Sequence, residues 1–115
     1  MIFTELPTPT LLLDKEKLIA NSSRMQASAD RLGVQLRPHL KTMKAARAAE
    51  LLIASGASGI TVSTLKEADY FFEHGFTDIT YAVGMVPAKL AEAAKLIALG
   101  ADLKIMTDSP EVAQV

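Results

Sequence analysis

The sequence predicts an α/β fold in which short strands alternate with helices and pair in parallel. Two observations carry this prediction. Strand-like runs alternate with segments of helical periodicity along the whole chain. Glycines follow the helical segments where a left-handed helix end would place them, namely Gly33, Gly56, Gly75 and Gly100. This alternation predicts a parallel sheet covered by helices, either an open doubly wound sheet or a closed (β/α) barrel.

The first two helices have recognisable boundaries. We expect a strand at Thr10–Asp14, whose last residue can cap a helix over Lys15–Leu32 with apolar side chains along one face. The next strand is expected at Val34–Lys41. An alanine-rich helix at about 44–55 follows it, and Gly56 ends that helix.

The remaining units follow the same order. Residues Ile60–Ser63 are expected to form a strand. The run Thr64-Leu65-Lys66-Glu67 has the spacing of a capping box, in which the hydroxyl accepts a main-chain N–H and the carboxylate reaches back. The other expected elements are the strands Asp78–Val83 and Asp102–Met106, a helix over Ala88–Leu99 that Pro87 can begin, and a helix opened by Ser109-Pro110-Glu111.

The polar pattern of one strand favours the barrel over the open sheet. In Val34–Lys41, alternation places Leu36 and Leu40 on one face of the strand. The residues on the other face are Gln35, Arg37, His39 and Lys41. Strands covered by helices on both faces are continuous apolar runs, whereas a polar face can line the interior of a barrel.

Composition and charge exclude several classes of function. The chain has 115 residues, a formal net charge of -1 and no cysteine. It is therefore not a strongly basic nucleic-acid binder, and it can hold no disulfide, zinc thiolate or cysteine nucleophile. No apolar run is long enough for a membrane span and no signal peptide is recognisable, so we expect a soluble cytoplasmic protein without membrane or nucleic-acid partners. The expected strands would leave open sheet edges, so we also expect a fragment of a longer protein.

The segment Arg37–Lys44 has the densest group of reactive side chains. In (β/α) folds such groups act from the carboxyl ends of strands, and Lys41 lies at such an end. Partial burial and the positive neighbours Arg37 and His39 favour the neutral amine that forms Schiff bases, so Lys41 is the candidate nucleophile. Lys44 is expected to lie in solvent, in the first turn of the next helix.

Each of these residues also has a plainer interpretation. A lysine after a strand is usually a surface charge, and a structural role is the commoner one for a histidine such as His39. A helix cap is a simpler role for Thr64 than contact with a ligand. The positive cluster could bind phosphate or nucleic acid, although no aromatic residue is interleaved with it. The residues alone leave these alternatives open.

Three segments together resemble one enzyme family. They are Thr8-Pro9-Thr10-Leu11-Leu12-Leu13-Asp14, Arg37-Pro38-His39-Leu40-Lys41-Thr42-Met43-Lys44 and Gly59-Ile60-Thr61-Val62-Ser63-Thr64-Leu65-Lys66-Glu67-Ala68. On these motifs the chain resembles the D-threonine aldolase and D-serine dehydratase-like family. These are fold-type III enzymes that use pyridoxal 5'-phosphate (PLP) and are related to the alanine racemase N-terminal domain. The resemblance covers essentially the whole chain but only about the first third of a usual family member.

The resemblance implies a fold and a set of roles. Residues 15–115 would form the first half of a PLP-binding (β/α)8 barrel of the TIM type, and residues 1–14 would supply the first strand of a second β-domain. Lys41 matches the lysine that forms the internal aldimine with PLP in this family. The residues expected to contact the cofactor are Lys41, His39, Thr42 and Thr64. The phosphate site and a divalent metal, manganese or zinc, would be held by residues beyond Val115.

The resemblance also implies an activity. The leading expectation is a PLP-dependent lyase of the D-threonine aldolase type, which cleaves β-hydroxy-D-amino acids to glycine and an aldehyde. Dehydration of D-serine or D-threonine is the alternative, followed by amino-acid racemisation or a non-catalytic PLP carrier. The expected partners are a small-molecule D-amino acid and, in the full-length protein, a second copy of the chain. The isolated fragment is expected to be inactive.

Overall fold

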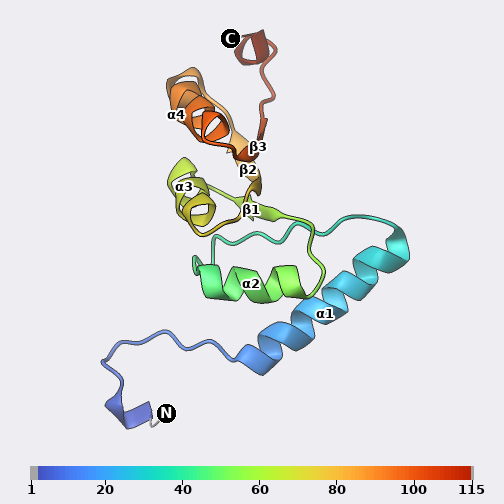
Figure 1. Cartoon of the computed structure of the whole chain (residues 1–115), viewed down its shortest axis with the longest axis vertical. Helices are drawn as coiled ribbons and strands as arrows, with labels where there is room; N and C mark the ends of the chain where they lie inside the picture. The colour runs from blue at the N-terminus through green and yellow to red at the C-terminus, as the bar shows by residue number, and fades with distance from the viewer. Residues whose placement is uncertain (1–2, 115) are drawn as a thin grey trace.

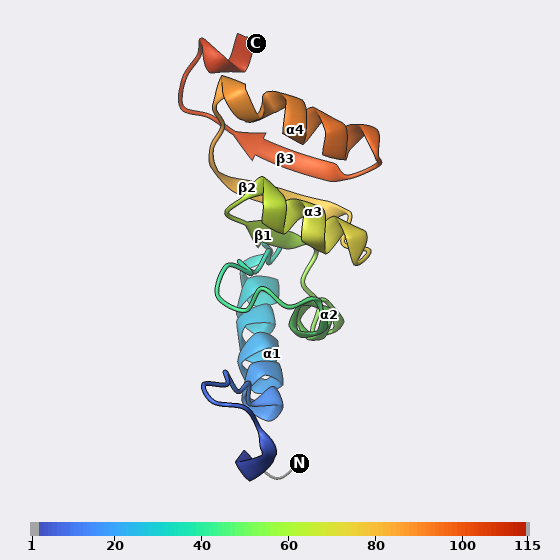
Figure 2. The same cartoon turned by 90° about the vertical axis from the view of Figure 1, so that its left-hand side faces the viewer.

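The strands of this chain form one parallel sheet, and helices connect them. The computed structural model describes residues 3–114. The elements in order are α1 (Lys15–Leu32), α2 (Ala46–Ala54), β1 (Ile60–Val62), α3 (Leu65–Glu73), β2 (Asp78–Gly84), α4 (Pro87–Ala98) and β3 (Asp102–Met106), with 3-10 turns at Phe3–Glu5 and Val112–Gln114. The sheet has the order β1-β2-β3 with both pairs parallel, and α3 and α4 lie along one of its faces (Figures 1 and 2). In this described part of the chain, no helix combines the length and apolar composition that a bilayer crossing requires. The expected parallel α/β fold is confirmed.

Local signals set the ends of two helices. Asp14 accepts a hydrogen bond from the Lys17 N–H at 3.0 Å at the start of α1. Gly33 ends that helix with a φ of 67°, a left-handed conformation that glycine adopts without strain. Thr64 caps α3 by accepting the Glu67 N–H at 3.0 Å. Each of these boundaries lies where the sequence predicts it.

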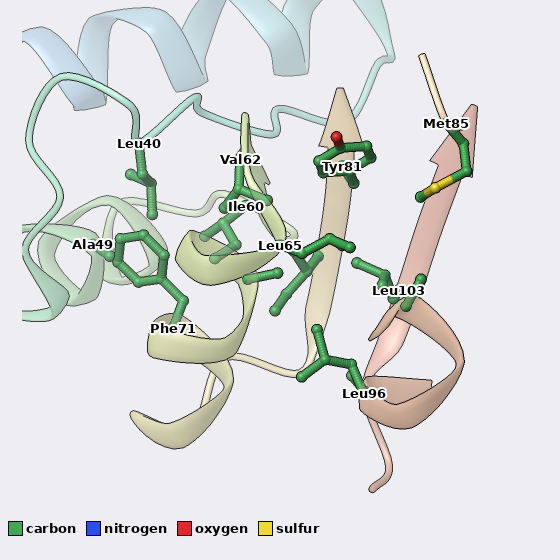
Figure 3. Packing of buried hydrophobic residues seen from close by; sticks show 14 of the residues in the cluster. Leu40, Ala49, Ile60, Val62, Leu65, Phe71, Tyr81, Met85, Leu96 and Leu103 are labelled. Atoms are coloured by element: carbon green, nitrogen blue, oxygen red, sulfur yellow. The ribbon is translucent and has the colours of Figure 1, made fainter. Parts of the chain in front are cut away.

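The core lies between the sheet and the helices on its covered face. Alternate strand residues point into this core and are buried, namely Ile60, Val62, Ile79, Tyr81 and Leu103. They pack against side chains of α3 and α4, among them Phe71 and Leu96 (Figure 3). The intervening residues on the other face are polar and half-buried, and include Thr61, Asp78, Thr80 and Lys104. The face without helices is therefore polar, as expected of a barrel interior.

Residues 34–41 do not form the strand that the sequence predicts. They run beside β1, but among the described residues only His39 pairs with it, in an isolated parallel bridge to Thr61. The physical reason is Pro38, which has no N–H with which to continue the ladder toward the amino end. The Pro38 carbonyl still accepts the Thr61 N–H at 2.9 Å. The segment is therefore placed like a strand, although its main chain is sparsely bonded.

Two predictions at the ends of the chain are also wrong. Thr10–Asp14 forms no strand, because no strand within residues 3–114 pairs with it and an extended segment needs a partner. The helix expected from Ser109 is a short 3-10 turn at Val112–Gln114, in which the Gln114 N–H donates to the Glu111 carbonyl three residues earlier, at 3.3 Å. The assignment of residues 1–14 to a second domain stays a prediction.

Candidate functional site

The carboxyl end of the sheet brings together residues that the sequence singles out. The parallel bridge pairs His39 with Thr61. Two residues further along both segments, the same register places Lys41 beside Ser63, just past the end of β1. The Ser63 Oγ lies 3.1 Å from the His39 Nε2. His39, Lys41 and Ser63 therefore form one group at this edge.

Hydrogen bonds determine which nitrogen of His39 carries a proton. The Lys41 N–H donates to His39 Nδ1 at 3.3 Å, so Nδ1 has no proton of its own. In the neutral ring Nε2 then carries the proton and can donate it to the Ser63 Oγ. Burial, and secondly the positive charge of Lys41, lower the pKa of His39 below its ordinary value of 6.5. The ring is therefore neutral at physiological pH.

The two lysines of the segment differ in their partners. Lys41 is exposed, and within residues 3–114 no carboxylate lies at ion-pairing distance from its Nζ. The Lys44 Nζ lies 3.1 Å from the Glu67 Oε1. Lys44 is exposed, as expected. Its expected place in the first turn of the next helix is wrong, because its φ of 43° is left-handed and α2 begins only at Ala46. Of these two lysines, Lys41 is the one whose amine has no described anion within ion-pairing distance.

Arg37 was expected to place its positive charge next to Lys41, but it pairs with Asp78 instead. Its guanidinium donates two hydrogen bonds to the Asp78 carboxylate, from Nη1 to Oδ1 at 2.5 Å and from Nη2 to Oδ2 at 2.8 Å. Asp78 is the first residue of β2 and marks the amino end of the sheet, whereas Lys41 lies at the carboxyl end. His39 does lie beside Lys41, but its ring is neutral, so neither expected neighbour places a positive charge next to Lys41.

Glu67 links the two loops of the site. Its Oε2 accepts the Ser63 N–H at 2.8 Å, while its Oε1 pairs with the Lys44 Nζ at 3.1 Å. Burial by itself would raise the pKa of Glu67, but the hydrogen bond from Ser63 and the ion pair with Lys44 outweigh it and hold the pKa below its ordinary value of 4.5. Sequence reasoning missed Glu67 as a site residue, whereas Ser63 was expected at the carboxyl end of a strand, where such sites lie. The signal for Glu67 was the capping box, which predicts that its carboxylate turns back along the chain.

Thr42 and Thr64 also lie at this edge and are exposed. The Thr64 Oγ1 accepts the Glu67 N–H, and its hydroxyl can still donate one hydrogen bond. The assignment of Thr42, Thr64 and His39 to cofactor binding stays a prediction. Within residues 3–114 no group of three or more metal-ligating side chains occurs. The expectation of a divalent metal concerns residues beyond Val115 and also stays a prediction.

Comparisons with known proteins give a consistent group of relatives. A family model described as alanine racemase, N-terminal domain, matches residues 13–115. A D-threo-3-hydroxyaspartate dehydratase of Delftia sp. (strain HT23) is 50% identical over 109 residues, which are 95% of this chain and 29% of the relative. The solved structure of that dehydratase superposes with a TM-score of 0.92 over 96% of this chain and 29% of its own. A D-threonine aldolase of Arthrobacter sp. is 45% identical over 73% of this chain and 22% of its own length. A D-serine dehydratase of Dictyostelium discoideum is 34% identical over 92% of this chain and 28% of its own length.

These relatives confirm the expected fold and the coarse chemistry of the family. The chain matches the amino-terminal part of a fold-type III PLP barrel domain and spans about 29% of the length of the Delftia dehydratase. The relatives are lyases, either dehydratases or aldolases, named for D-amino acids. The 50% identical relative is a dehydratase, so the expectation of aldolase activity in particular is not confirmed. A mutant D-threo-3-hydroxyaspartate dehydratase was solved in a metal-free form, which implies a metal in that relative.

Proposed function

We propose a function from one premise: this chain belongs to the alanine racemase N-terminal domain family. The whole protein, of which this chain would form the amino-terminal part, is proposed to be a PLP-dependent lyase that dehydrates 3-hydroxy-D-amino acids. The observation that carries the proposal is the Lys41 amine, which is exposed at the carboxyl end of the sheet with no described anion to neutralise it. Such an amine is the group to which an aldehyde cofactor attaches.

The residues of this edge fit PLP. Lys41 offers a primary amine, and its main chain is held by the ring of His39, whose lowered pKa keeps that ring neutral. The competing amine of Lys44 is paired with Glu67. Lys41 would hold the cofactor, with His39, Thr42 and Thr64 as the further contacts that we propose. When bound, PLP supplies an electron sink for the charge that develops at the substrate Cα.

Lys41 has two tasks in this proposal. Its Nζ would hold the cofactor, and once freed from it the same Nζ would take the proton from the substrate Cα. In a dehydration that proton leaves Cα, hydroxide leaves Cβ, and hydrolysis of the resulting enamine gives a 2-oxo acid and ammonia. His39 has an orienting role, because its Nδ1 holds the Lys41 N–H and its Nε2 contacts the Ser63 Oγ.

Aldol cleavage is the second candidate. The similarity to the D-threonine aldolase of Arthrobacter sp., at 45% identity, supports it. It needs a base at the substrate hydroxyl instead of at Cα, and it breaks the Cα–Cβ bond to give glycine and an aldehyde. The dehydratase is preferred because the identity to the Delftia dehydratase, 50%, extends over 95% of this chain, whereas the match to the aldolase covers 73%.

Product analysis with the whole protein tests the proposal. The protein, supplied with PLP and either manganese or zinc, is incubated with D-threo-3-hydroxyaspartate, D-serine and D-threonine. Ammonia and the matching 2-oxo acid are the expected products, and the L-enantiomers and a Lys41→Ala variant, which lacks the amine, should give none. Glycine and an aldehyde without ammonia would replace the dehydratase by the aldolase. No product from any D-substrate would contradict both.

A further inference from the structure

The segment that carries Lys41 is held to the sheet by few main-chain bonds. Among the residues that the structure describes, its one ladder pair is the bridge between His39 and Thr61, because Pro38 has no N–H to donate. A slip of one residue along a strand moves every side chain to the opposite face. The other main-chain bonds of this segment to the chain around β1 are those that join Thr61 to Pro38 and Leu40 and the one from the Ser58 N–H to the Leu36 carbonyl at 3.0 Å. Side-chain contacts therefore add to a small set of main-chain bonds in fixing how far the segment is advanced along β1.

Arg37 joins this segment to β2, which is not the neighbouring strand. The order across the sheet is segment 34–41, β1 and then β2. The Arg37 guanidinium reaches Asp78 with two hydrogen bonds, at 2.5 and 2.8 Å. A paired bond of this kind fixes both distance and direction. A Cβ at Gly59 would lie 2.8 Å from the Asp78 Cγ and would also crowd the Arg37 Nη1, so glycine there leaves room for the ion pair.

The Asp78 carboxylate is itself anchored from the other side. The Lys104 Nζ of β3 lies 2.7 Å from the Asp78 Oδ1 and 2.7 Å from the Asp102 Oδ2. The hydrogen bonds from Arg37, opposed by burial and assisted by Lys104, hold the pKa of Asp78 below its ordinary value of 3.8. Asp78 is therefore charged at neutral pH, and the ion pairs connect segment 34–41 to β2 and β3.

We propose that Arg37 is a positioning residue for Lys41: its ion pair with Asp78 sets the register of residues 37–41 and thereby places the Lys41 amine at the carboxyl end of the sheet. Arg37 acts through the extended main chain between the two residues and touches neither cofactor nor substrate. The inference rests on the proposed function, in which Lys41 holds PLP. It also explains why an inward-facing arginine lies on the same segment as the reactive lysine.

The test uses the whole protein with the variants Arg37→Gln, Arg37→Lys and, as a matched control, Lys104→Gln. The control removes the other cation from Asp78 but leaves segment 34–41 tethered. One readout is the rate at which PLP-free protein captures added PLP, followed by absorbance. The other is hydrogen exchange of the peptide covering 38–43 in the protein without PLP.

Arg37→Gln is expected to slow capture by about 10-fold or more, because a displacement of about 1 Å can cost about 100-fold in rate. Exchange over residues 38–43 should become faster in the same variant. Arg37→Lys should be intermediate, since an ammonium group cannot form the paired bond. Lys104→Gln should match the wild type in both readouts.

Two results would overturn the inference. One is wild-type capture and exchange in Arg37→Gln, and the other is equal slowing in Lys104→Gln, which would give Arg37 a merely structural role. If Arg37→Gln does not fold, Gly59→Ala crowds the same ion pair without removing a charge, and wild-type values there would also overturn it. A wild-type protein that captures no PLP would contradict the proposed function, while hydrogen exchange would still test the tether.

Discussion

His39 is the residue whose protonation state most directly affects how Lys41 is held. Its Nδ1 accepts the Lys41 N–H, and this contact is lost if that nitrogen takes up a proton. Burial and the charge of Lys41 lower the pKa of His39 from 6.5, so the folded protein binds this proton less readily than the unfolded chain. The contribution of His39 to the free energy of unfolding is therefore fully present above pH 6.5. It is lost as the pH drops through the folded-state pKa.

Two substitutions at position 39 separate the contacts of the ring. The side-chain oxygen of asparagine can take the place of Nδ1, whereas glutamine reaches the position of Nε2. We expect wild-type hydrogen-exchange protection of the Lys41 amide, corrected for the intrinsic rate, to persist just below pH 6.5 and to be lost at lower pH. His39→Asn should retain protection throughout, because its oxygen does not titrate there. His39→Gln should have low protection at every pH, and the same acid loss in His39→Asn as in the wild type would contradict this account.

Among the elements, α3 organises the loops on both sides of the site. Its capping residue Thr64 and its carboxylate Glu67 fix the turn after β1, and Glu67 also holds Lys44. Lys44 has a left-handed φ of 43°, which is unfavourable for a residue with a side chain. The ion pair with Glu67 helps to hold this conformation, and with it the loop that follows Lys41.

Removal of the Glu67 charge should destabilise this part of the protein in a pH-dependent way. Glu67→Gln keeps an oxygen for the Ser63 N–H but loses the ion pair, at a cost of about 1 kcal/mol in the free energy of unfolding at neutral pH. The pKa of Glu67 is lowered from 4.5, so the difference from the wild type should be present above that pH and shrink as the pH falls through the folded-state pKa. Thermal unfolding of the whole protein at several pH values measures it.

The matched control for this prediction is Glu73→Gln, at the exposed end of the same helix. It changes the charge of α3 equally, and no side-chain hydrogen bond or ion pair of Glu73 occurs among the described residues, so its effect on the unfolding temperature should be small. A difference between Glu67→Gln and the wild type that stays constant from neutral to acid pH would contradict the ion-pair explanation.

Elements with local end signals could be predicted from the sequence, and those that depend on pairing could not. The helix Lys15–Leu32 has the predicted bounds because Asp14 and Gly33 define both of its ends. Residues 34–41 alternate like a strand, but a strand is defined by its ladder, and Pro38 interrupts that ladder. The expected strand Thr10–Asp14 failed for the related reason that no described strand pairs with it.

The whole molecule is more extended than a compact domain of its length. Its radius of gyration is 16.5 Å, whereas about 13 Å is typical of a compact chain of this size. The outer strand β3 pairs only with β2 among the described residues, and the apolar side chains of Ile105 and Met106 on it are 43% and 47% exposed. The open sheet edge and the polar inner face are what part of a barrel would have. This fits the comparison, in which the chain spans about 29% of the length of the Delftia relative.

At this scale the site was only partly predictable. The segment around Lys41 could be identified because its reactive residues are adjacent in sequence. The partner of Arg37 could not, because Asp78 lies 41 residues further along the chain and only the sheet order brings the two together. Arg37, Asp78 and Lys104 are inward-facing charges on three neighbouring segments, and this pattern was a usable signal for ion pairs. Which of them pair could be decided only from the register of the segments in the sheet.

The attachment site of the cofactor tests the central claim most directly. The whole protein is loaded with PLP, treated with borohydride to make the attachment permanent, digested and analysed by mass spectrometry. The account predicts a pyridoxyl group on the peptide that contains Lys41, its loss in Lys41→Gln and its retention in Lys44→Gln. Modification of Lys44 or Lys66 instead, or no modification of this chain at all, would contradict it.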